Sequence, residues 1–207
     1  MNRTLVRRSL LAGTTTVLTL LIATGCASGS TDHGGMAAGG PSATQPASGS
    51  TGQGHNDGDI AFAQMMIPHH QQAVEMATLA ATRASDPQIK ELAAQIKAAQ
   101  APEITTMTNW LKAWGMPTAA AHDMHEGMAH MPGMLSDQEL AQLKAASGKD
   151  FDRLFARMMI AHHNGAIQMC RDVRIQGVSA EVNALATKIE QVQADEVAVL
   201  EEILDRL

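Results

Sequence analysis

An internal duplication constrains this chain more than any other feature of its sequence. Residues Phe62–His70 read FAQMMIPHH and residues Phe155–His163 read FARMMIAHH, at an offset of 93 residues. The same offset continues without a gap, pairing Asp59 with Asp152 and extending to Leu204. Two copies of one unit are expected to stack so that they bury a shared core.

Each unit is predicted to be a helical hairpin. In the first unit, apolar residues recur in steps of three and four from Phe62 to Ala80 and again from Ile89 to Trp114, which is the spacing of one helix face. The chain is rich in Ala, Leu and Met, with three Phe and no Tyr, and this composition favours helices over strands. Asp59 is expected to cap the first helix. The fold class is therefore predicted to be an all-α four-helix bundle.

The expected organisation has three parts. Residues 1–25 carry three arginines and then a short apolar run, which is typical of a signal peptide. Cys26 follows a small residue and is the expected lipidation site, which would anchor an exported protein to the outer face of the membrane. Residues 26–58 are rich in Gly, Ser, Ala, Thr and Pro and form the expected tether. The bundle would occupy 59–207, with a first hairpin at 59–115, a connection at 116–151 and a second hairpin at 152–207.

The connection contains a tract of histidine and methionine. Three His and four Met fall within residues 122–134, a segment that also contains Gly and Pro. Two interpretations are open: a loop that folds around a soft metal ion, or a loop with methionine as apolar filler. Ser136 and Glu139 form a capping-box pattern, so a short helix is predicted from Asp137 to about Ala146.

Polar residues also lie on the predicted core faces of the hairpins. With turns near residues 86 and 179, His69 is expected to face Glu103, and His162 to face Glu196. Such a pair can be purely structural, the carboxylate can orient a metal-bound imidazole, or it can bind the metal itself. Each pair of histidines is preceded by two methionines at i, i+4 spacing, which places sulfur and imidazole on one helix face.

Copper is the metal that this donor set favours. Thioether sulfur selects Cu(I), and imidazole suits copper and zinc. Structural zinc sites favour closely spaced cysteines, which the chain lacks, and Cys170 is expected to be a buried thiol. The candidate copper ligands are His69, His70, His162, His163, Met65, Met66, Met158, Met159, Met107, His122, Met124, His125, Met128, His130, Met131 and Met134. Glu103 and Glu196 are the candidates to orient those ligands.

The doubled Met-Met-Ile-x-His-His element, with Met131-Pro-Gly-Met134 before its second copy, resembles the bacterial domain-of-unknown-function family 305. The resemblance covers residues 55–207. It implies a ferritin-like four-helix bundle, commonly exported and associated with copper. The resemblance supports the predicted fold more than it supports any mechanism.

Three hypotheses for function remain open at this stage. The first is a copper chaperone, buffer or sequestering protein outside the cytoplasm, with a copper-exchange protein as partner and no enzymatic activity. The second is a ferritin-like redox metalloenzyme, although the chain lacks the Glu-x-x-His element of di-iron bundles. The third is a metal-free helical interaction module. The net charge of −6 argues against nucleic acid as a partner.

Overall fold

The computed structural model describes residues 54–118 and 131–207, and every structural statement concerns these residues. The expected signal peptide, Cys26 and most of the tether lie outside the described residues. So do five of the candidate ligands in the connection: His122, Met124, His125, Met128 and His130.

The described residues form helices and no strand, which confirms the predicted all-α class. The helices are α1 (Asp57–Arg83), α2 (Pro87–Ala113), α4 (Asp137–Ala145), α5 (Gly148–Gln176) and α6 (Ala180–Arg206). The short helix α4 matches the predicted one, with the capping box of Ser136 and Glu139 in place. Within these ranges, no helix is long and apolar enough to cross a membrane.

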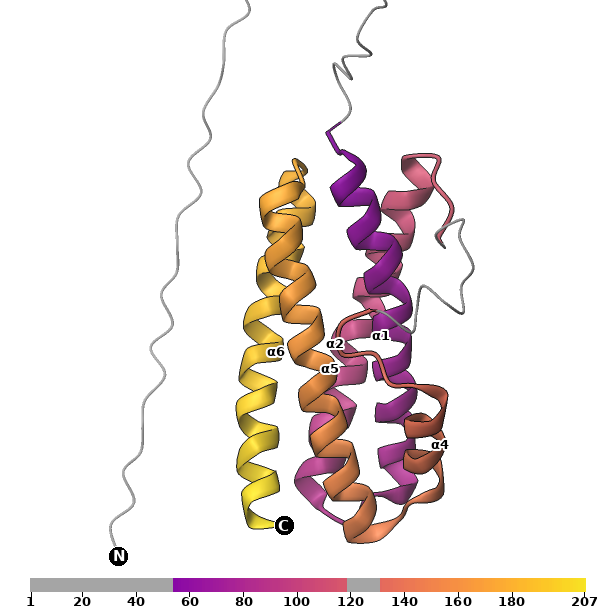
Figure 1. The fold of residues 1–207 in the computed structure, drawn as a ribbon, viewed down its shortest axis with the longest axis vertical. Coiled ribbons are helices and arrows are strands. Elements are labelled where there is room, and N and C mark those ends of the chain that lie inside the picture. The colour runs from indigo at the N-terminus through magenta and orange to yellow at the C-terminus, as the bar shows by residue number, and fades with distance from the viewer. Residues whose placement is uncertain (1–53, 119–130) are drawn as a thin grey trace, which may run out of the picture. The chain divides into compact units, whose positions relative to one another are not determined.

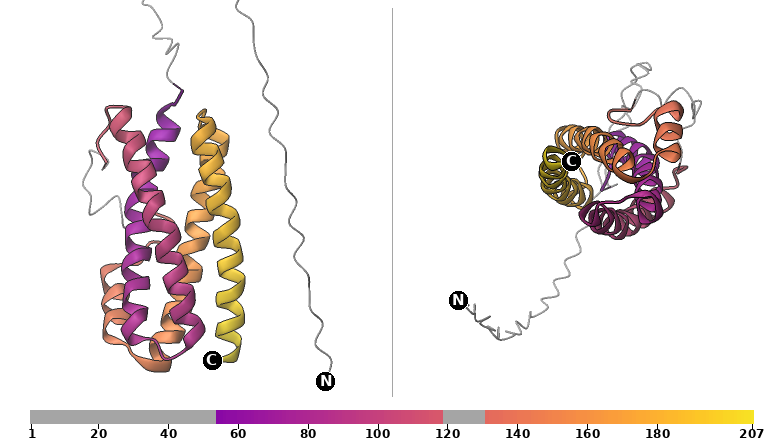
Figure 2. Two further views of the ribbon diagram at one scale, coloured as in Figure 1. Left: turned by 180° about the vertical axis from the view of Figure 1, so that it is seen from behind. Right: turned by 90° about the horizontal axis from the view of Figure 1, so that it is seen from below.

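The four long helices lie side by side as two antiparallel hairpins (Figure 1). Helices α1 and α2 form the first hairpin, and α5 and α6 form the second. The hairpins meet mainly through α1 and α5, whereas α2 and α6 pack less closely. Seen from one end, α4 lies outside the ring of long helices (Figure 2), where it contacts α1 and α5.

The start of α1 corrects the prediction for Asp59. The N-cap is Asn56, whose side chain accepts a hydrogen bond from the backbone N–H of Asp59 at 3.1 Å. Asp59 is the third helical residue, and its carboxylate accepts from the Asn56 N–H at 2.9 Å. Asn56 and Asp59 together form a capping box, so Asp59 contributes to the cap from the third helical position instead of being the N-cap.

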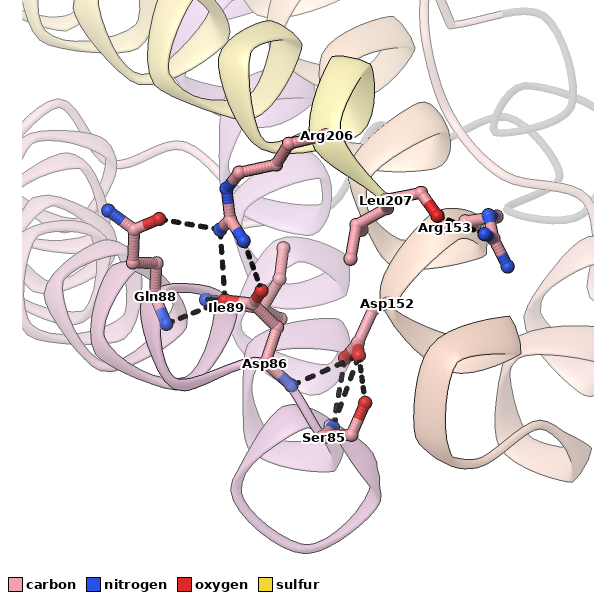
Figure 3. Close-up of polar contacts among 8 residues, drawn as sticks. All are labelled: Ser85, Asp86, Gln88, Ile89, Asp152, Arg153, Arg206 and Leu207. Carbon is pink, nitrogen blue, oxygen red and sulfur yellow. Dashed lines mark hydrogen bonds and ion pairs between the residues drawn. The ribbon is translucent and has the colours of Figure 1, made fainter.

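Each hairpin uses a buried aspartate to hold the turn of the other hairpin. The Asp59 carboxylate accepts hydrogen bonds from the backbone N–H groups of Val178 and Ser179, in the turn between α5 and α6. Its repeat partner Asp152 accepts from Ser85, through backbone and hydroxyl, and from the Asp86 N–H, in the turn between α1 and α2 (Figure 3). Both carboxylates are fully buried. A buried carboxylate is tolerated because several N–H and O–H donors satisfy it.

The apolar core consists of two clusters. One cluster lies toward the turn between α1 and α2 and contains Phe151, Phe155 and Met159. The other lies toward the turn between α5 and α6 and contains Phe62, Met66 and Met107. Between them along the helices are four histidines, two glutamines and two glutamates, so the middle of the bundle is polar. These residues are His69, His70, His162, His163, Gln100, Gln193, Glu103 and Glu196.

Candidate metal centre

All four histidines of the duplicated element are buried. His69, His70 and His163 are fully buried, and His162 is 1% exposed. Helices α1 and α5 supply them from equivalent positions of the two repeats. The expectation that His69 and His162 lie inside the bundle is met, but His70 and His163 lie there as well.

The histidine–glutamate pairing differs by one residue from the prediction. Glu103 lies 3.1 Å from Nε2 of His70, rather than of His69. Likewise, Glu196 lies 2.7 Å from Nε2 of His163, rather than of His162. Successive residues of a helix differ by about 100° in direction. The second histidine of each pair therefore faces the other helix of its own hairpin, and the first faces the opposite hairpin.

His69 and His162 consequently meet across the interface between the hairpins. Their ring centroids are 3.7 Å apart, and the ring planes are inclined by 35°. Nε2 of His69 donates to the backbone carbonyl of Pro132 at 3.1 Å. Both ring nitrogens of His162 lack a hydrogen-bond partner in the described protein.

The hydrogen bonds show which ring nitrogen of a neutral histidine carries the free lone pair. Nε2–H of His69 donates to Pro132, and Nε2–H of His70 donates to Glu103, so Nδ1 is the unprotonated nitrogen of each neutral ring. Both Nδ1 atoms are buried and have no partner among the described residues. Nε2 of His163 is close to Glu196 but is not aligned for a hydrogen bond. Buried acceptors without a donor are costly, and a metal ion would satisfy them.

Burial also keeps the rings of His69, His70 and His162 neutral, which metal binding requires. Desolvation, with the neighbouring imidazole of His70 as the next cause, lowers the pKa of His69 to about 3. Desolvation likewise lowers the pKa of His70, against the opposing effect of Glu103. The pKa of His162 lies well below its usual value, first through desolvation and then through His69.

The end of the histidine–methionine tract is packed against this centre. Met131 and Met134 flank Pro132, whose carbonyl contacts His69, and Gly133, which has a φ of +77°. A Cβ on Gly165 of α5 would clash with the Pro132 carbonyl. The position equivalent to Gly165 in the first repeat is Gln72, whose side-chain amide binds both the N–H and the carbonyl of Leu135, at 2.8 and 3.0 Å.

The methionines of the duplicated element do not all point the same way. Met66 and Met159 are fully buried in the two apolar clusters, and Met107 is buried beside Met66. Met65 is 38% exposed, and Met158 is half-buried. Met131 and Met134 are half-buried, in the segment whose Pro132 carbonyl contacts His69. Cys170 is buried in the apolar cluster of Phe62, and burial, followed by the charge of Glu190, raises its pKa to about 12.

No group of three or more His, Cys, Asp or Glu side chains is arranged to hold a metal ion in the described ranges. A metal at the histidines therefore needs sulfur ligands or a change of side-chain position. Sequence reasoning missed His70 and His163 as the partners of the glutamates, and it gave no role to Gln72, Gln100, Gln193 or Gly165. A signal for His70 existed, because Met66, His70, Ala73 and Ala77 also recur in steps of four and three.

The fold and this site define a class: a four-helix bundle built from two repeats, with a buried histidine layer contributed equally by both. The model of the family named domain of unknown function DUF305 matches residues 59–204, so this chain belongs to the DUF305 family. None of the curated proteins compared with the chain matches it.

Solved structures of the same fold agree with this family assignment. A DUF305 protein of Streptomyces coelicolor, described as secreted, is 29% identical with a TM-score of 0.66, over 72% of this chain and 93% of that one. A DUF305 fragment from Deinococcus radiodurans is 31% identical with a TM-score of 0.66, over 73% and 98% of the chains. CopM in its Cu(II)-bound form is 33% identical with a TM-score of 0.63, over 72% and 96%. CopM has also been solved in Cu(I)-bound and Ag-bound forms.

Proposed function

We propose that this protein binds copper outside the cytoplasm, with Cu(I) preferred, and acts in copper homeostasis as a chaperone, a buffer or a sequestering protein. One observation carries the proposal: Nδ1 of His69 and Nδ1 of His70 are buried lone-pair nitrogens without a partner among the described residues, while Nε2 of each ring is held by an acceptor. A ligating histidine is typically oriented in this way through its other nitrogen. The copper-bound and silver-bound forms of CopM support the choice of metal.

The proposed centre draws nitrogen from His69, His70, His162 and His163. Sulfur would come first from Met131 and Met134, because their segment is packed against His69. The buried Met66, Met107 and Met159 and the more exposed Met65 and Met158 are the remaining sulfur candidates. Thioether sulfur with neutral imidazole favours Cu(I) over harder ions. Glu103 and Glu196 would orient His70 and His163.

The remainder of the tract is proposed as a second copper-binding segment. Its donors are His122, Met124, His125, Met128 and His130. The tract is continuous in sequence with Met131, so copper bound there would be close along the chain to the proposed centre. A copper-exchange protein is the proposed partner.

Copper stoichiometry tests the proposal. We expect the purified protein to bind Cu(I), and a variant with His69, His70, His162 and His163 all changed to Ala to lose at least one equivalent while circular dichroism shows an unchanged helix content. Deleting residues 122–130 leaves the packed segment from Met131 onward and should remove a different equivalent. Silver(I) titrated in parallel excludes redox chemistry of the probe.

The outcomes separate the three hypotheses for function. Equal binding by wild type and the four-histidine variant would assign copper to the tract and make the buried histidines structural. If the wild type itself binds no copper, the metal-free helical interaction module becomes the leading hypothesis. Catalytic oxygen consumption by the Cu(I)-loaded protein over many turnovers would favour the redox enzyme.

We also propose export with a lipid anchor at Cys26, after removal of residues 1–25. The arginine-containing start, the short apolar run and the cysteine after a small residue support it. An intact mass of the mature protein that begins at an unmodified residue other than Cys26 would refute the anchor.

A further inference from the structure

A small pocket lies between α2 and α6, on the side of the bundle where the two hairpins pack least closely. Gln100 and Glu103 line it from α2, and Lys188, Gln193 and Glu196 line it from α6. The duplication relates these side chains, because Gln100 is equivalent to Gln193 and Glu103 to Glu196. The polar lining of the pocket therefore includes two amides and two carboxylates from matching positions of the two repeats, and apolar side chains complete the lining: Ala99, Ile189 and Val192.

Both amide oxygens, and the amide nitrogen of Gln100, have no hydrogen-bond partner in the described protein. Gln100 and Gln193 are each 2% exposed. Both side-chain polar atoms of Gln100 and the carbonyl oxygen of Gln193 are buried without a hydrogen bond. Leaving such buried groups unsatisfied is unfavourable, so a ligand that contacts them is favoured.

The carboxylates are incompletely neutralised. Lys188 reaches across from α6 and lies 3.1 Å from Glu103. Glu196 contacts His163 and has no lysine or arginine within ion-pair distance among the described residues. The residue equivalent to Lys188 in the first repeat is Gln95, which carries no charge. The pocket thus contains two carboxylates and one ammonium group, and that ammonium is on a side chain that is 61% exposed and free to turn outward.

We propose that the pocket between α2 and α6 is a site for a hard divalent cation of the Mg²⁺, Ca²⁺ or Mn²⁺ class, held by oxygen atoms of Gln100, Gln193, Glu103 and Glu196. Carboxylate and amide oxygens are the ligands that these ions prefer. The site contains no sulfur, so its chemistry differs from that of the proposed copper centre. Lys188 competes with the ion for Glu103. This proposal does not depend on copper binding.

Titration of the metal-free protein with Mn²⁺, followed by the electron paramagnetic resonance signal of the free ion, tests the site. Wild type should bind one Mn²⁺ per chain. The double variant Gln100→Leu, Gln193→Leu removes two ligands at little cost in stability, because neither amide oxygen has a partner among the described residues. It should weaken Mn²⁺ binding by about tenfold or more.

A second variant is expected to change the Mn²⁺ affinity in the opposite direction. Lys188→Met removes the competing ammonium and should tighten Mn²⁺ binding several-fold. Lys97→Met is the matched control, because Lys97 is an exposed lysine of α2 that does not line the pocket, and it should leave the affinity unchanged. Should the double leucine variant fail to fold, Gln100→Glu adds a carboxylate to the pocket and is expected to tighten binding.

Three results would overturn the proposal. The first is no Mn²⁺ binding by wild type at millimolar concentration, which would mean that the pocket holds water only. The second is binding that Lys188→Met and the glutamine variants leave unchanged. The third is binding that disappears in the four-histidine variant but survives in the glutamine variants, which would place the ion at the histidines. Copper stoichiometry measured on the same proteins tests the copper proposal separately.

Discussion

The histidines illustrate how one residue type takes two roles at adjacent positions. His70 and His163 each turn to a glutamate of their own hairpin, at 3.1 and 2.7 Å. His69 and His162 meet each other between the hairpins. Burial keeps His69, His70 and His162 neutral, because the charged form would lose its hydration. The same burial that costs stability in acid prepares the nitrogens to bind a metal ion.

The lowered pKa values of His69, His70 and His162 should make the metal-free protein less stable in acid. The unfolded chain binds protons at histidine as the pH falls below about 6.5, whereas His69 stays neutral in the folded protein down to a pKa of about 3. The unfolded state then binds more protons, so the free energy of unfolding should fall as the pH falls through this window, by up to about 1.4 kcal/mol per pH unit for His69. Above pH 6.5 these groups should contribute no pH dependence.

Urea unfolding at pH 7.5 and at pH 5 measures this dependence. The control variant His69→Gln, His162→Gln removes two of the buried rings and should flatten the slope. A free energy of unfolding that stays constant or rises as the pH falls from 6.5 to 5 would contradict the prediction.

At the scale of elements, the segment from Met131 to Leu135 joins the connection to the bundle. The two equivalent positions of the repeats have diverged to hold it: Gln72 binds the backbone of Leu135, and Gly165 makes room for the Pro132 carbonyl. Neither residue is a candidate metal ligand. Their contacts explain how a segment without helical structure stays packed against His69.

Gly165→Ala should destabilise the protein by about 1–3 kcal/mol, because the new Cβ would overlap the Pro132 carbonyl. In an ordinary helix the same change is stabilising, by roughly 1 kcal/mol. In a background where residues 131–134 are replaced by a Gly/Ser linker, Gly165→Ala should therefore raise the free energy of unfolding instead of lowering it. Thermal or urea unfolding of the four proteins gives both values.

Asn164→Ala is the matched control for this cycle, since Asn164 is the exposed neighbour of Gly165 on α5. Its effect should be the same in both backgrounds. If Gly165→Ala had equal effects with and without the natural segment, the close approach would not be the reason for a glycine there.

At the scale of the whole molecule, the two hairpins hold each other at both ends. Asp59 of the first repeat satisfies the turn at Val178 and Ser179, and Asp152 of the second satisfies the turn at Ser85 and Asp86. Arg206, near the end of α6, adds an ion pair to Asp86 at 2.7 Å (Figure 3). The duplication thus produces a reciprocal pair of contacts that neither hairpin could make alone.

Removing either carboxylate should be costly. Asp59→Ala or Asp152→Ala leaves two or more backbone N–H donors without an acceptor, and we expect each to lower the free energy of unfolding by about 2–4 kcal/mol. Asp57→Ala and Asp150→Ala remove the same charge from exposed positions in the first turns of α1 and α5, and should cost well under 1 kcal/mol each. Urea unfolding of the four variants compares them. Similar losses at buried and exposed positions would show that charge at the helix start, rather than the contact between hairpins, stabilises the bundle.

The sequence by itself determined the helices and the pairing of the repeats. Helical periodicity and capping are local properties, so α4 and the four long helices could be predicted from Phe62, Ser136 and their neighbours. Because the unit occurs twice, the prediction of one helical hairpin could be extended to a four-helix bundle. The sequence also placed the histidines near the glutamates, because antiparallel register depends only on where the turn lies.

Only the tertiary structure decided which histidine meets which partner. His69 and His70 differ by about 100° around α1, and packing between hairpins sets that rotation. The contact of Pro132 with Gly165 and the pocket between α2 and α6 likewise join residues that are far apart in the chain. Such contacts depend on how whole helices are placed against one another, which no local pattern of residues specifies.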